Sequence, residues 1–251
     1  MSDDSASNAL VSIVVPCFGQ LEHTRLSLPR VLRNSRPPFE LICVDVGSLD
    51  GTTDYLCGVT DAAPVRVEVV RKGSDRDFGA AVGEAFGQAR GEFVAWVNND
   101  VLVPKLWLQQ LVALATANRA LGMVGPMSNL APDPQRVHDV PYRLRRQCHP
   151  GSKAPAWQDS VLDTAPFDQF AKEHREHNTG EWMEVERLGG FCLLLSRAAL
   201  ATGALLDDQA EAGVFDADRL SVRVRRAGHR LGCCRDLFMH HFGSHYAASD
   251  R

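Results

Sequence analysis

The sequence of 251 residues contains no long hydrophobic run. No apolar stretch approaches the roughly 20 residues that a membrane-spanning helix needs, so we predict no transmembrane segment, which leaves peripheral membrane contact open. The first five residues are acidic and polar, unlike a secretory signal. We therefore predict a disordered lead over residues 1–10 and a cytoplasmic protein.

An excess of basic residues is also missing. The formal net charge is −4, whereas a nucleic-acid-binding surface shows a basic stripe, so we predict no nucleic-acid partner. The seven cysteines include no Cys-x-x-Cys pair, which argues against a zinc site and against a disulfide framework. Cys17, Cys43 and Cys192 lie inside apolar runs and are predicted to be small core residues.

The first apolar run, at 11–15, is not followed by Gly-x-Gly-x-x-Gly. The segment Pro16-Cys17-Phe18-Gly19 stands there instead, which argues against a dinucleotide-binding oxidoreductase. Internal repeats and linkers are absent as well. The sequence therefore indicates one domain, which we place at residues 11–246, with a short tail at 247–251.

Apolar strands and amphipathic helices alternate along the first half of the chain. The spacing predicts strands over 11–15, 39–45, 65–70, 93–97 and 123–126, with helices over 20–34, from 52, over 78–89 and over 104–119. This order is typical of an α/β protein with a mostly parallel sheet covered on both faces.

The second half of the chain is less regular. Residues 127–178 are predicted to form loops with one helix near 167–174, the kind of long excursion that often forms lids or specificity elements. Beyond it, the pattern predicts antiparallel strands over 182–187 and 191–195, a helix over 216–227 that ends at Gly228, and a last strand over 231–239.

The most informative stretch is Phe93–Val101. Five apolar and aromatic residues run directly into Asn98, Asn99 and Asp100. Ligands of open parallel sheets bind at the carboxyl ends of the strands, and right-handed crossovers bring those ends to one edge. We therefore expect Asp45, which ends another strand, to lie at the same edge as Asp100. A carboxylate at a strand end is also a common turn former, and Asp45 keeps that alternative.

Several segments, taken in order, resemble the family-two glycosyltransferases of the GT-A fold. They are Val11-Ser-Ile-Val-Val-Pro16, Val44-Asp45-x-Gly47-Ser48-x-Asp50-Gly51-Thr52, Val97-Asn98-Asn99-Asp100, Gly190-Phe-Cys-Leu-Leu-Leu-Ser-Arg197, Phe215-Asp216-x-Asp218 with Arg223-x-Arg225-x-Ala227-Gly228, and His240-His241-Phe-Gly-Ser244. The nearest likeness is to bacterial enzymes that build surface polysaccharides, including rhamnosyltransferase-like members.

The resemblance implies an inverting, metal-dependent transfer of a sugar. The donor would be a nucleotide-diphosphate sugar, the acceptor a hydroxyl of a glycan, a lipid-linked molecule or a protein, and the cofactor Mn²⁺ or Mg²⁺. Residues 11–126 would form the nucleotide-sugar half of the domain and residues 127–246 the acceptor half.

The resemblance also assigns roles to single residues. Asp100 would hold the metal, with His240 and His241 as further ligands of the metal or contacts of the diphosphate. The nucleotide would be bound by Pro16, Cys17, Phe18, Asp45, Gly47 and Asn99. The donor sugar and acceptor would meet Asn98, Gly190 and Phe191. The general base would be Asp216 or Asp218.

The chain departs from the family at the acidic motif. The family's Glu-Asp-x-Asp becomes Asp216-Ala217-Asp218-Arg219, so the position of the base falls on Ala217. Either Asp216, which we favour, or Asp218 takes the role, or both are charges that stabilise a helix N-terminus. The alternative function is a catalytically silent nucleotide-sugar-fold module that acts as a binding or scaffolding domain of a larger protein.

The chain departs from the family at two further positions. Val46 replaces the family's usual Asn, and Arg76-Asp77-Phe78 lacks the usual Asn and Gly. A nucleotidyltransferase is disfavoured because the first loop lacks the Gly-rich, Arg- and Lys-bearing pattern that binds a triphosphate.

Overall fold

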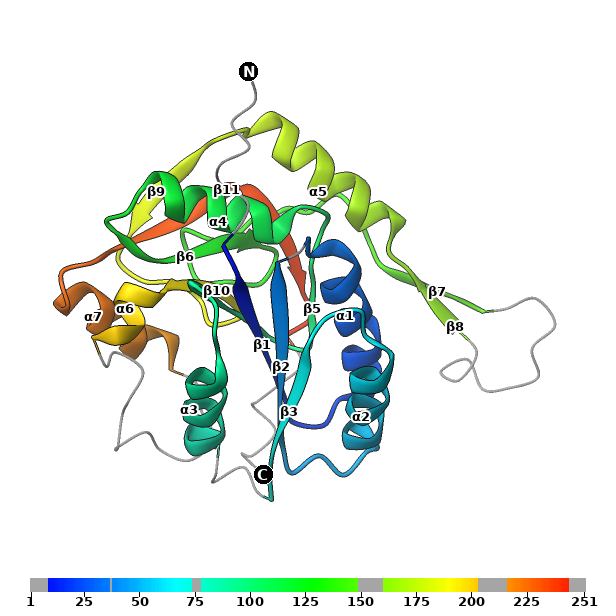
Figure 1. The fold of residues 1–251 in the computed structure, drawn as a ribbon. Helices are drawn as coiled ribbons and strands as arrows, with labels where there is room; N and C mark the ends of the chain where they lie inside the picture. Colours follow the sequence, from blue (N-terminus) through cyan, green and yellow to red (C-terminus); the bar gives the residue numbers. More distant parts are fainter. Residues whose placement is uncertain (1–8, 37, 74–77, 149–159, 203–215, 244–251) are drawn as a thin grey trace, which may run out of the picture.

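The apolar runs form the central strands of one mixed sheet in the computed structural model (Figure 1), which describes residues 9–36, 38–73, 78–148, 160–202 and 216–243. The strands are β1 (Val11–Cys17), β2 (Phe39–Val46), β3 (Val67–Lys72), β4 (Phe93–Val97), β5 (Val101–Leu102), β6 (Leu121–Ser128), β7 (Arg145–Cys148), β8 (Ser160–Asp163), β9 (Trp182–Val185), β10 (Cys192–Ser196) and β11 (Arg230–His241). The helices are α1 (Leu21–Asn34), α2 (Thr52–Ala62), α3 (Phe78–Gln88), α4 (Trp107–Ala117), α5 (Ala165–His177), α6 (Arg197–Ala201) and α7 (Ala217–Arg226).

The order of the strands explains where the chain can bind a ligand. The main sheet has the order β3-β2-β1-β4-β10-β6-β11-β5, and β9 pairs with β11. The first four of these strands are parallel, whereas β10 runs antiparallel to both β4 and β6. The carboxyl ends of β1, β2 and β4 therefore lie at one edge of the sheet.

Alternate residues of each central strand face opposite sides, so the sheet separates two apolar layers. On β1, Ile13 and Val15 pack in one layer with residues of α1, α2 and α4. Val14 lies in the other layer, which includes residues of α3, α5, α6 and α7. Figure 1 shows α1 and α2 on one side of β1–β3 and α3 on the other. This is the doubly covered sheet that the sequence predicts.

Most predicted elements are confirmed, with differences at their ends. The first strand continues through Pro16 and Cys17, because a parallel partner, β2, runs alongside it to Asp45. The last strand likewise includes both histidines, since His240 and His241 pair with β5. The two strands predicted near 182–195 do not pair with each other: β9 pairs with β11, and β10 with β4 and β6.

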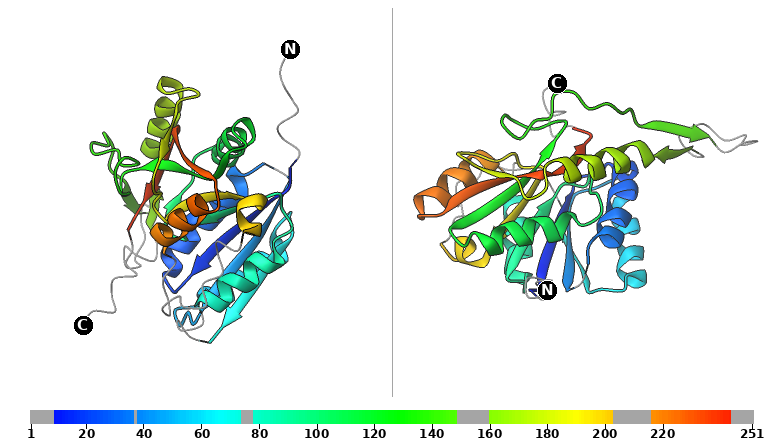
Figure 2. Two further views of the ribbon diagram at one scale, coloured as in Figure 1. Left: turned by 90° about the vertical axis from the view of Figure 1, so that its left-hand side faces the viewer. Right: turned by 90° about the horizontal axis from the view of Figure 1, so that it is seen from above.

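The excursion after β6 contains structure that the sequence pattern does not predict. Strands β7 and β8 form a two-stranded antiparallel sheet that extends away from the main sheet beyond the start of α5 (Figure 2). Helix α5 is longer than expected. His174 on this helix is half-buried: its imidazole Nε2 lies 2.8 Å from the Arg235 carbonyl, and its ring centroid lies 5.8 Å from that of Phe238.

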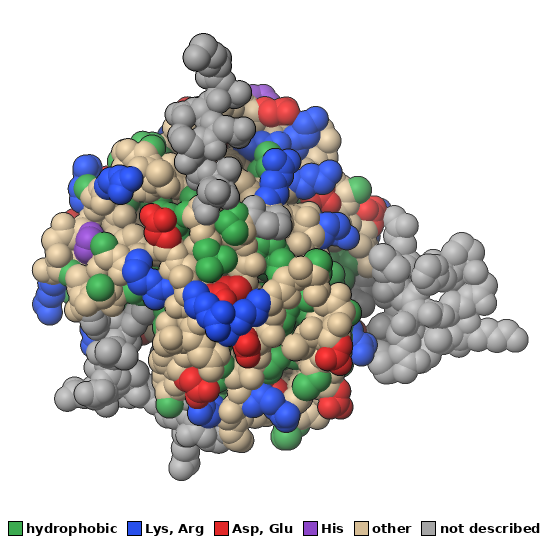
Figure 3. All heavy atoms as spheres, viewed as in Figure 1, with side chains coloured by type: hydrophobic (Ala, Val, Ile, Leu, Met, Phe, Trp, Pro, Cys, Tyr) green, Lys and Arg blue, Asp and Glu red, His purple; other side chains and the backbone are tan. Residues whose placement is uncertain are grey.

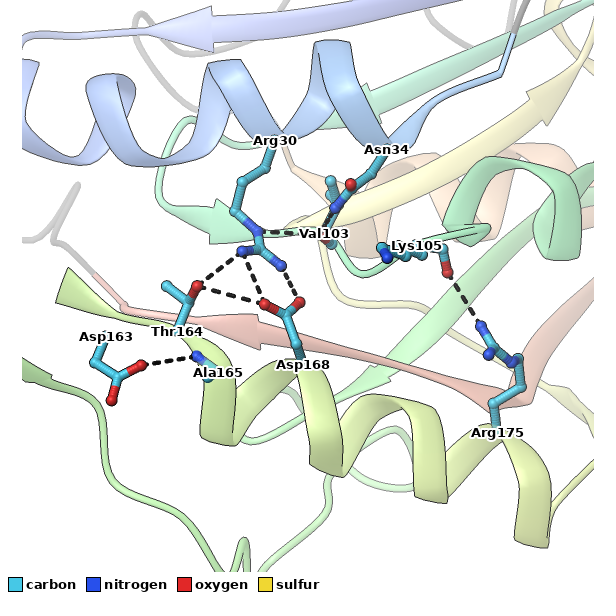
Figure 4. A network of polar contacts seen from close by, with 9 residues as sticks. All are labelled: Arg30, Asn34, Val103, Lys105, Asp163, Thr164, Ala165, Asp168 and Arg175. Atoms are coloured by element: carbon cyan, nitrogen blue, oxygen red, sulfur yellow. Dashed lines mark hydrogen bonds and ion pairs between the residues drawn. The ribbon is translucent and has the colours of Figure 1, made fainter.

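A buried arginine fixes the start of α5 (Figure 4). Arg30 on α1 is 6% exposed and forms an ion pair with Asp168 on α5. Its guanidinium also donates to Thr164 Oγ1 at 3.0 Å and to the Val103 carbonyl at 3.3 Å, and it lies 5.2 Å from the centre of the Phe167 ring. These contacts hold the excursion after β6 against the first half of the sheet.

The predicted core residues are buried, and the surface carries both signs of charge. Cys17, Cys43 and Cys192 are fully buried, and Trp96 and Trp107 are at most 1% exposed. Burial raises the pKa of the Cys17 thiol, and it raises the pKa of the Cys43 thiol to about 12. Acidic and basic side chains are interspersed over much of the face in Figure 3. None of the described helices is long and apolar enough to cross a membrane.

A carboxylate at the opposite edge of the sheet, Glu40, joins three segments. Its Oε1 accepts hydrogen bonds from Ser12 Oγ at 2.6 Å and from the Arg90 amide at 2.7 Å, and Arg66 pairs with Oε2. Burial by itself would raise the pKa of Glu40, but these donors outweigh burial and hold the pKa below the usual value for a glutamate.

We expect Glu40→Gln to destabilise the fold at neutral pH by about 1–3 kcal/mol, because charge-assisted hydrogen bonds are lost. A lowered folded-state pKa means that this contribution is present above the unfolded pKa and disappears as the pH falls through the folded value. Urea unfolding from about pH 7 to about pH 3.5 measures it. Glu68→Gln, which removes the more exposed partner of Arg66, is the control. A pH-independent difference would contradict the assignment.

Candidate active site

Three neighbouring strands end where the candidate site lies. The register sets Cys17 beside Asp45, and Asn98–Asp100 follows β4 directly. The structure thus brings Asp45 and Asp100 to one edge, as the crossovers predict. Of the residues expected to line a nucleotide pocket, Pro16 and Cys17 are buried, whereas Phe18 is 43% exposed.

Asp45 binds its own turn. It is 2% exposed, Oδ1 accepts the Ser48 amide at 3.3 Å, and Oδ2 accepts the hydroxyl of Thr53 on α2. Gly47 supplies the positive φ of 70° that this turn needs. These contacts match the turn-forming alternative; recognition of a base or ribose by Asp45 stays a prediction.

A second carboxylate joins this turn to the loop after β1. Asp50 Oδ2 accepts the Leu21 amide at 2.9 Å, and Oδ1 accepts the Thr52 hydroxyl at 2.6 Å. Burial would raise the pKa of Asp50, but the hydrogen bonds from Thr52 and Leu21 lower the pKa below the usual value for an aspartate. The Gly19 amide also donates to Ser48 Oγ at 2.8 Å. The two loops that flank a ligand at this edge therefore hold each other in place.

The two asparagines after β4 are likewise bound within the protein. Asn98 Oδ1 accepts the Trp96 indole N–H at 3.0 Å. Asn99 Nδ2 donates to the Gly19 carbonyl at 3.2 Å and to Thr24 Oγ1 at 2.9 Å. Asn99 thus positions the loop after β1, a role the sequence does not reveal because Thr24 lies 75 residues away. Their expected contacts with nucleotide and donor stay predictions.

Asp100 and His241 meet at the centre of the site. The pairing of β5 with β11 sets His241 opposite Val101, and His241 Nε2 lies 3.4 Å from Asp100 Oδ2. His241 Nδ1 lies 3.0 Å from the Leu130 carbonyl, which fixes Nδ1 as the donor. Burial by itself would lower the pKa of His241, but Asp100 and the Leu130 carbonyl outweigh burial, so the pKa is raised. The side chain of Asp100 is 5% exposed and that of His241 is 17% exposed.

His240 faces a different environment. Its Nδ1 lies 2.7 Å from the Tyr142 hydroxyl, and its ring lies 4.8 Å from that of Phe242. Burial, with the neighbouring His241, lowers the pKa of His240 to about 4 although Asp100 opposes the shift. The structure therefore separates the two histidines: His241 contacts Asp100, whereas His240 is held among aromatic rings. A metal-binding role for His240 stays a prediction.

The loop before β10 closes the site on one side. The Phe191 ring stacks on the His241 ring with 5.5 Å between centroids. The Phe191 carbonyl accepts a hydrogen bond from the Asn98 amide at 2.9 Å. The Gly190 carbonyl accepts the Trp96 indole N–H at 3.1 Å. The expected donor-side residues Asn98, Gly190 and Phe191 are therefore brought together.

Asp216 and Asp218 begin α7. Asp216 is the N-cap: its Oδ1 accepts the Arg219 amide at 3.0 Å, and Oδ2 lies 3.1 Å from Arg219 Nε. Asp218 is exposed in the first turn, whereas Ala217 is buried. The helix contacts the loop before β10 through Ser221, whose Oγ accepts the Leu188 amide at 3.2 Å. Phe215 and Ser244 of the family-like segments lie outside the described residues.

One residue that the sequence reading missed is Gln135. It is fully buried, its Nε2 donates to the Pro126 carbonyl at 2.8 Å, and its Oε1 accepts the Gly189 amide at 2.6 Å. It therefore holds the loop before β10 against β6. A glutamine in a proline-rich, irregular stretch gives no signal of burial.

We expect Gln135→Ala to cost about 2–4 kcal/mol of unfolding free energy, because it leaves two buried backbone groups unpaired. The exposed Gln169 on α5 bonds only its helix neighbour Glu173, so Gln169→Ala should stay within about 0.5 kcal/mol of the parent. Urea unfolding compares them. Equal midpoints for the two variants would show that Gln135 does not hold the loop.

The comparisons with known proteins concern the family and the fold. The family model for glycosyl transferase family 2 matches residues 12–156. Protein y4gI of Sinorhizobium fredii, which is uncharacterized, is 37% identical over 118 residues, covering 46% of this chain and 13% of that protein. The undecaprenyl-phosphate 4-deoxy-4-formamido-L-arabinose transferase of Pseudomonas syringae pv. syringae is 31% identical over 112 residues, covering 42% of this chain and 32% of that enzyme.

A solved structure extends the likeness over the second half. The mannosyltransferase PcManGT from Pyrobaculum calidifontis, in complex with GDP-Man and Mn²⁺, superposes with a TM-score of 0.64 at 17% identity, covering 93% of this chain and 56% of that one. The chain spans between 13% and 36% of the length of the curated relatives it matches. The family match covers more than half of the chain, and the structural match covers 93% of it, so the chain belongs to glycosyl transferase family 2 and has the GT-A glycosyltransferase fold.

Proposed function

We propose that this protein moves a sugar from a nucleoside-diphosphate donor to an acceptor hydroxyl, with inversion at the sugar carbon and with a divalent cation. The observation that carries the proposal is the Asp100–His241 pair at the carboxyl edge of a GT-A sheet. The solved relative from Pyrobaculum calidifontis, which holds GDP-Man and Mn²⁺, supports the choice of ligand and metal.

The residues at this pair fit a divalent cation. Because His241 Nδ1 is committed as a donor to the Leu130 carbonyl, the neutral His241 ring would present its Nε2 lone pair to a cation held by the Asp100 carboxylate. Among the described residues, no group of three or more His, Cys, Asp or Glu side chains gathers as a complete metal site. Two protein ligands completed by substrate phosphates are a common arrangement for Mg²⁺. Asp100 and His241 would thus hold the cation only together with the diphosphate.

The chemistry assigns the remaining work to residues around the pair. The bound cation would neutralise charge on the diphosphate as the bond to the sugar carbon breaks. Asp216 would accept the proton of the acceptor hydroxyl. The oxygen of that hydroxyl would form the new bond to the sugar carbon, on the side opposite to the leaving diphosphate. Asn98 and the Gly190–Phe191 loop would contact the sugar. The nucleoside would be contacted by Phe18, Asp45 and Gly47.

Thermal unfolding with nucleoside diphosphates tests the proposal. At ligand concentrations about 100 times Kd, binding adds about 2.7 kcal/mol to stability. For a chain of this size that is about 5–10 °C in Tm. We expect this shift for at least one of GDP, UDP, TDP, CDP and ADP in the presence of Mn²⁺, and a much smaller one in chelator. The absence of a shift with all five nucleotides would contradict a nucleotide-sugar site. Equal shifts with Mn²⁺ and with chelator would exclude a metal from nucleotide binding.

A catalytically silent binding module is the second candidate. It is favoured by the acidic motif: the position of the family's base falls on the buried Ala217, and Asp216 caps a helix and pairs with Arg219. Such a module would bind the nucleotide sugar but turn over none.

The finer biological setting is also a proposal. The name of the Pseudomonas syringae relative, an undecaprenyl-phosphate 4-deoxy-4-formamido-L-arabinose transferase, supports our proposal of a role in bacterial surface glycan synthesis. Our predictions of a cytoplasmic location and of separate donor and acceptor halves stay predictions.

A further inference from the structure

A hollow of about 440 Å³ lies beside the candidate active site, outside the residues assigned so far. It is lined by Val140, Pro141, Tyr142, Arg143, Arg145 and Pro166. Five of these residues come from the segment that leads into β7, and the sixth from the first turn of α5. The hollow therefore belongs to the excursion after β6, the part of the chain where irregular loops predict a specificity element.

The charges in this hollow are of one sign. Arg143 and Arg145 are exposed, and neither forms an ion pair or a side-chain hydrogen bond with any residue that the structure describes. Other arginines do: Arg230 pairs with Glu184, and Arg235 with Glu181. Two guanidinium groups on one concave wall, with no carboxylate among the described residues that line it, make a site for an oxyanion, because the planar fork binds carboxylate or phosphate through two parallel hydrogen bonds.

The nearest carboxylate is already engaged. Asp163 stands opposite Arg145 in the β7–β8 register, and its Oδ1 accepts the Ala165 amide at 3.0 Å, at the start of α5 (Figure 4). A carboxylate near the N-terminus of a helix is stabilised there by the helix dipole. One oxygen of Asp163 is therefore committed to the start of α5.

The wall of the hollow is continuous with the candidate active site. Tyr142 lines the hollow, and its hydroxyl lies 2.7 Å from Nδ1 of His240, the residue next to His241 in β11. The Tyr142 ring also packs against Phe167, with 6.1 Å between centroids. Phe167 lies under the Arg30 guanidinium, and Arg30 fixes α5 through Asp168. The hollow is thus held at a defined place relative to the Asp100–His241 pair.

We infer that this hollow is the acceptor subsite and that it selects an acceptor carrying an oxyanion, which Arg143 and Arg145 bind. Val140, Pro141 and Pro166 would make apolar contacts with the body of the acceptor. Tyr142 lies between this hollow and His240, on the side of the reacting centre. The inference rests on the proposed glycosyl transfer, since it names the acceptor class of that reaction. Two sources supply the same chemistry: the phosphate of a lipid-linked acceptor and the carboxylate of an acidic sugar in a glycan.

Binding measurements on the protein with Mn²⁺ and its best nucleoside diphosphate test the inference. The probes are methyl glucuronide, the neutral methyl glucoside, and monomeric dodecyl phosphate, each titrated by NMR. We expect at least one anionic probe to bind and the neutral glucoside to bind more weakly. The double variant Arg143→Gln, Arg145→Gln should weaken the anionic probe about tenfold or more, because charge-assisted hydrogen bonds are lost. Preference for the glucuronide or for the phosphate identifies the source.

The controls separate this inference from the proposed function. Arg119 is an exposed arginine between α4 and β6, at the opposite edge of the sheet, so Arg119→Gln should bind the probes like the parent. The double variant should keep the Mn²⁺-dependent thermal shift with nucleoside diphosphate. If that shift is absent in the parent, the proposed function fails. If the shift is present but no anionic probe binds, or the double variant binds it like the parent, the acceptor inference fails alone.

Discussion

Asp100→Asn should abolish the extra stabilisation that Mn²⁺ gives to the nucleoside-diphosphate complex. An amide carries no charge and is a much weaker ligand for a hard cation than a carboxylate. For the parent we expect about 5–10 °C between Mn²⁺ and chelator at saturating nucleotide, and for the variant close to none. Turnover of the donor should fall with it, because charge on the leaving diphosphate is no longer neutralised.

The chain offers a matched control for this variant. Asp133 also faces a histidine, His138, at 3.2 Å, but both side chains are more than 60% exposed and lie on the surface. Asp133→Asn should keep the full Mn²⁺ effect. Thermal unfolding of the apo proteins checks that Asp100→Asn still folds cooperatively. An Asp100→Asn protein that retains the parent's response to Mn²⁺ would show that the cation, if bound, is held elsewhere.

Predictability from the sequence follows the strength of the apolar periodicity. Strands such as 93–97 are buried on both faces and flanked by polar residues, so their type and their shared edge could be predicted. The convergence of Asp45, Asp100 and His241 followed from topology and resemblance. Strands β7 and β8 could not be predicted, because Arg145–Cys148 is polar and pairs only with its own hairpin partner.

The roles of individual polar side chains were harder to predict than their positions. Asn99 and Asp45 look like ligand-binding residues in sequence, yet their side chains form hydrogen bonds with Thr24 and Thr53, on helices that pack beside the strand ends. The alternation of a strand also separates adjacent residues: His241 turns toward Asp100, whereas His240 turns toward Tyr142. Sequence patterns report burial and order along the chain, but such contacts depend on which loops meet in space.

Asp216→Asn should separate an enzyme from a silent module. Asn caps a helix about as well as Asp, so the hydrogen bond from the Arg219 amide and the start of α7 should survive the change. The variant removes the carboxylate that would accept the proton of the acceptor hydroxyl, together with its ion pair to Arg219, which is exposed and contributes little to stability. Loss of a general base lowers turnover by about a hundredfold or more, while affinity for the donor should stay near that of the parent.

Asp218→Asn is the matched control for Asp216→Asn, because it removes the same charge from the same helical turn. Residues two apart on a helix do not share a face, so at most one of the two carboxylates can reach the acceptor, and Asp218→Asn should turn over the donor nearly like the parent. The measurement is release of nucleoside diphosphate, with acceptor and by slow hydrolysis without it. A large loss with Asp218→Asn alone would move the base to Asp218. Parental rates in both variants would leave neither carboxylate as the base, and a parent that binds nucleotide but releases none would make the binding module the better description, with Ala217 as its cause.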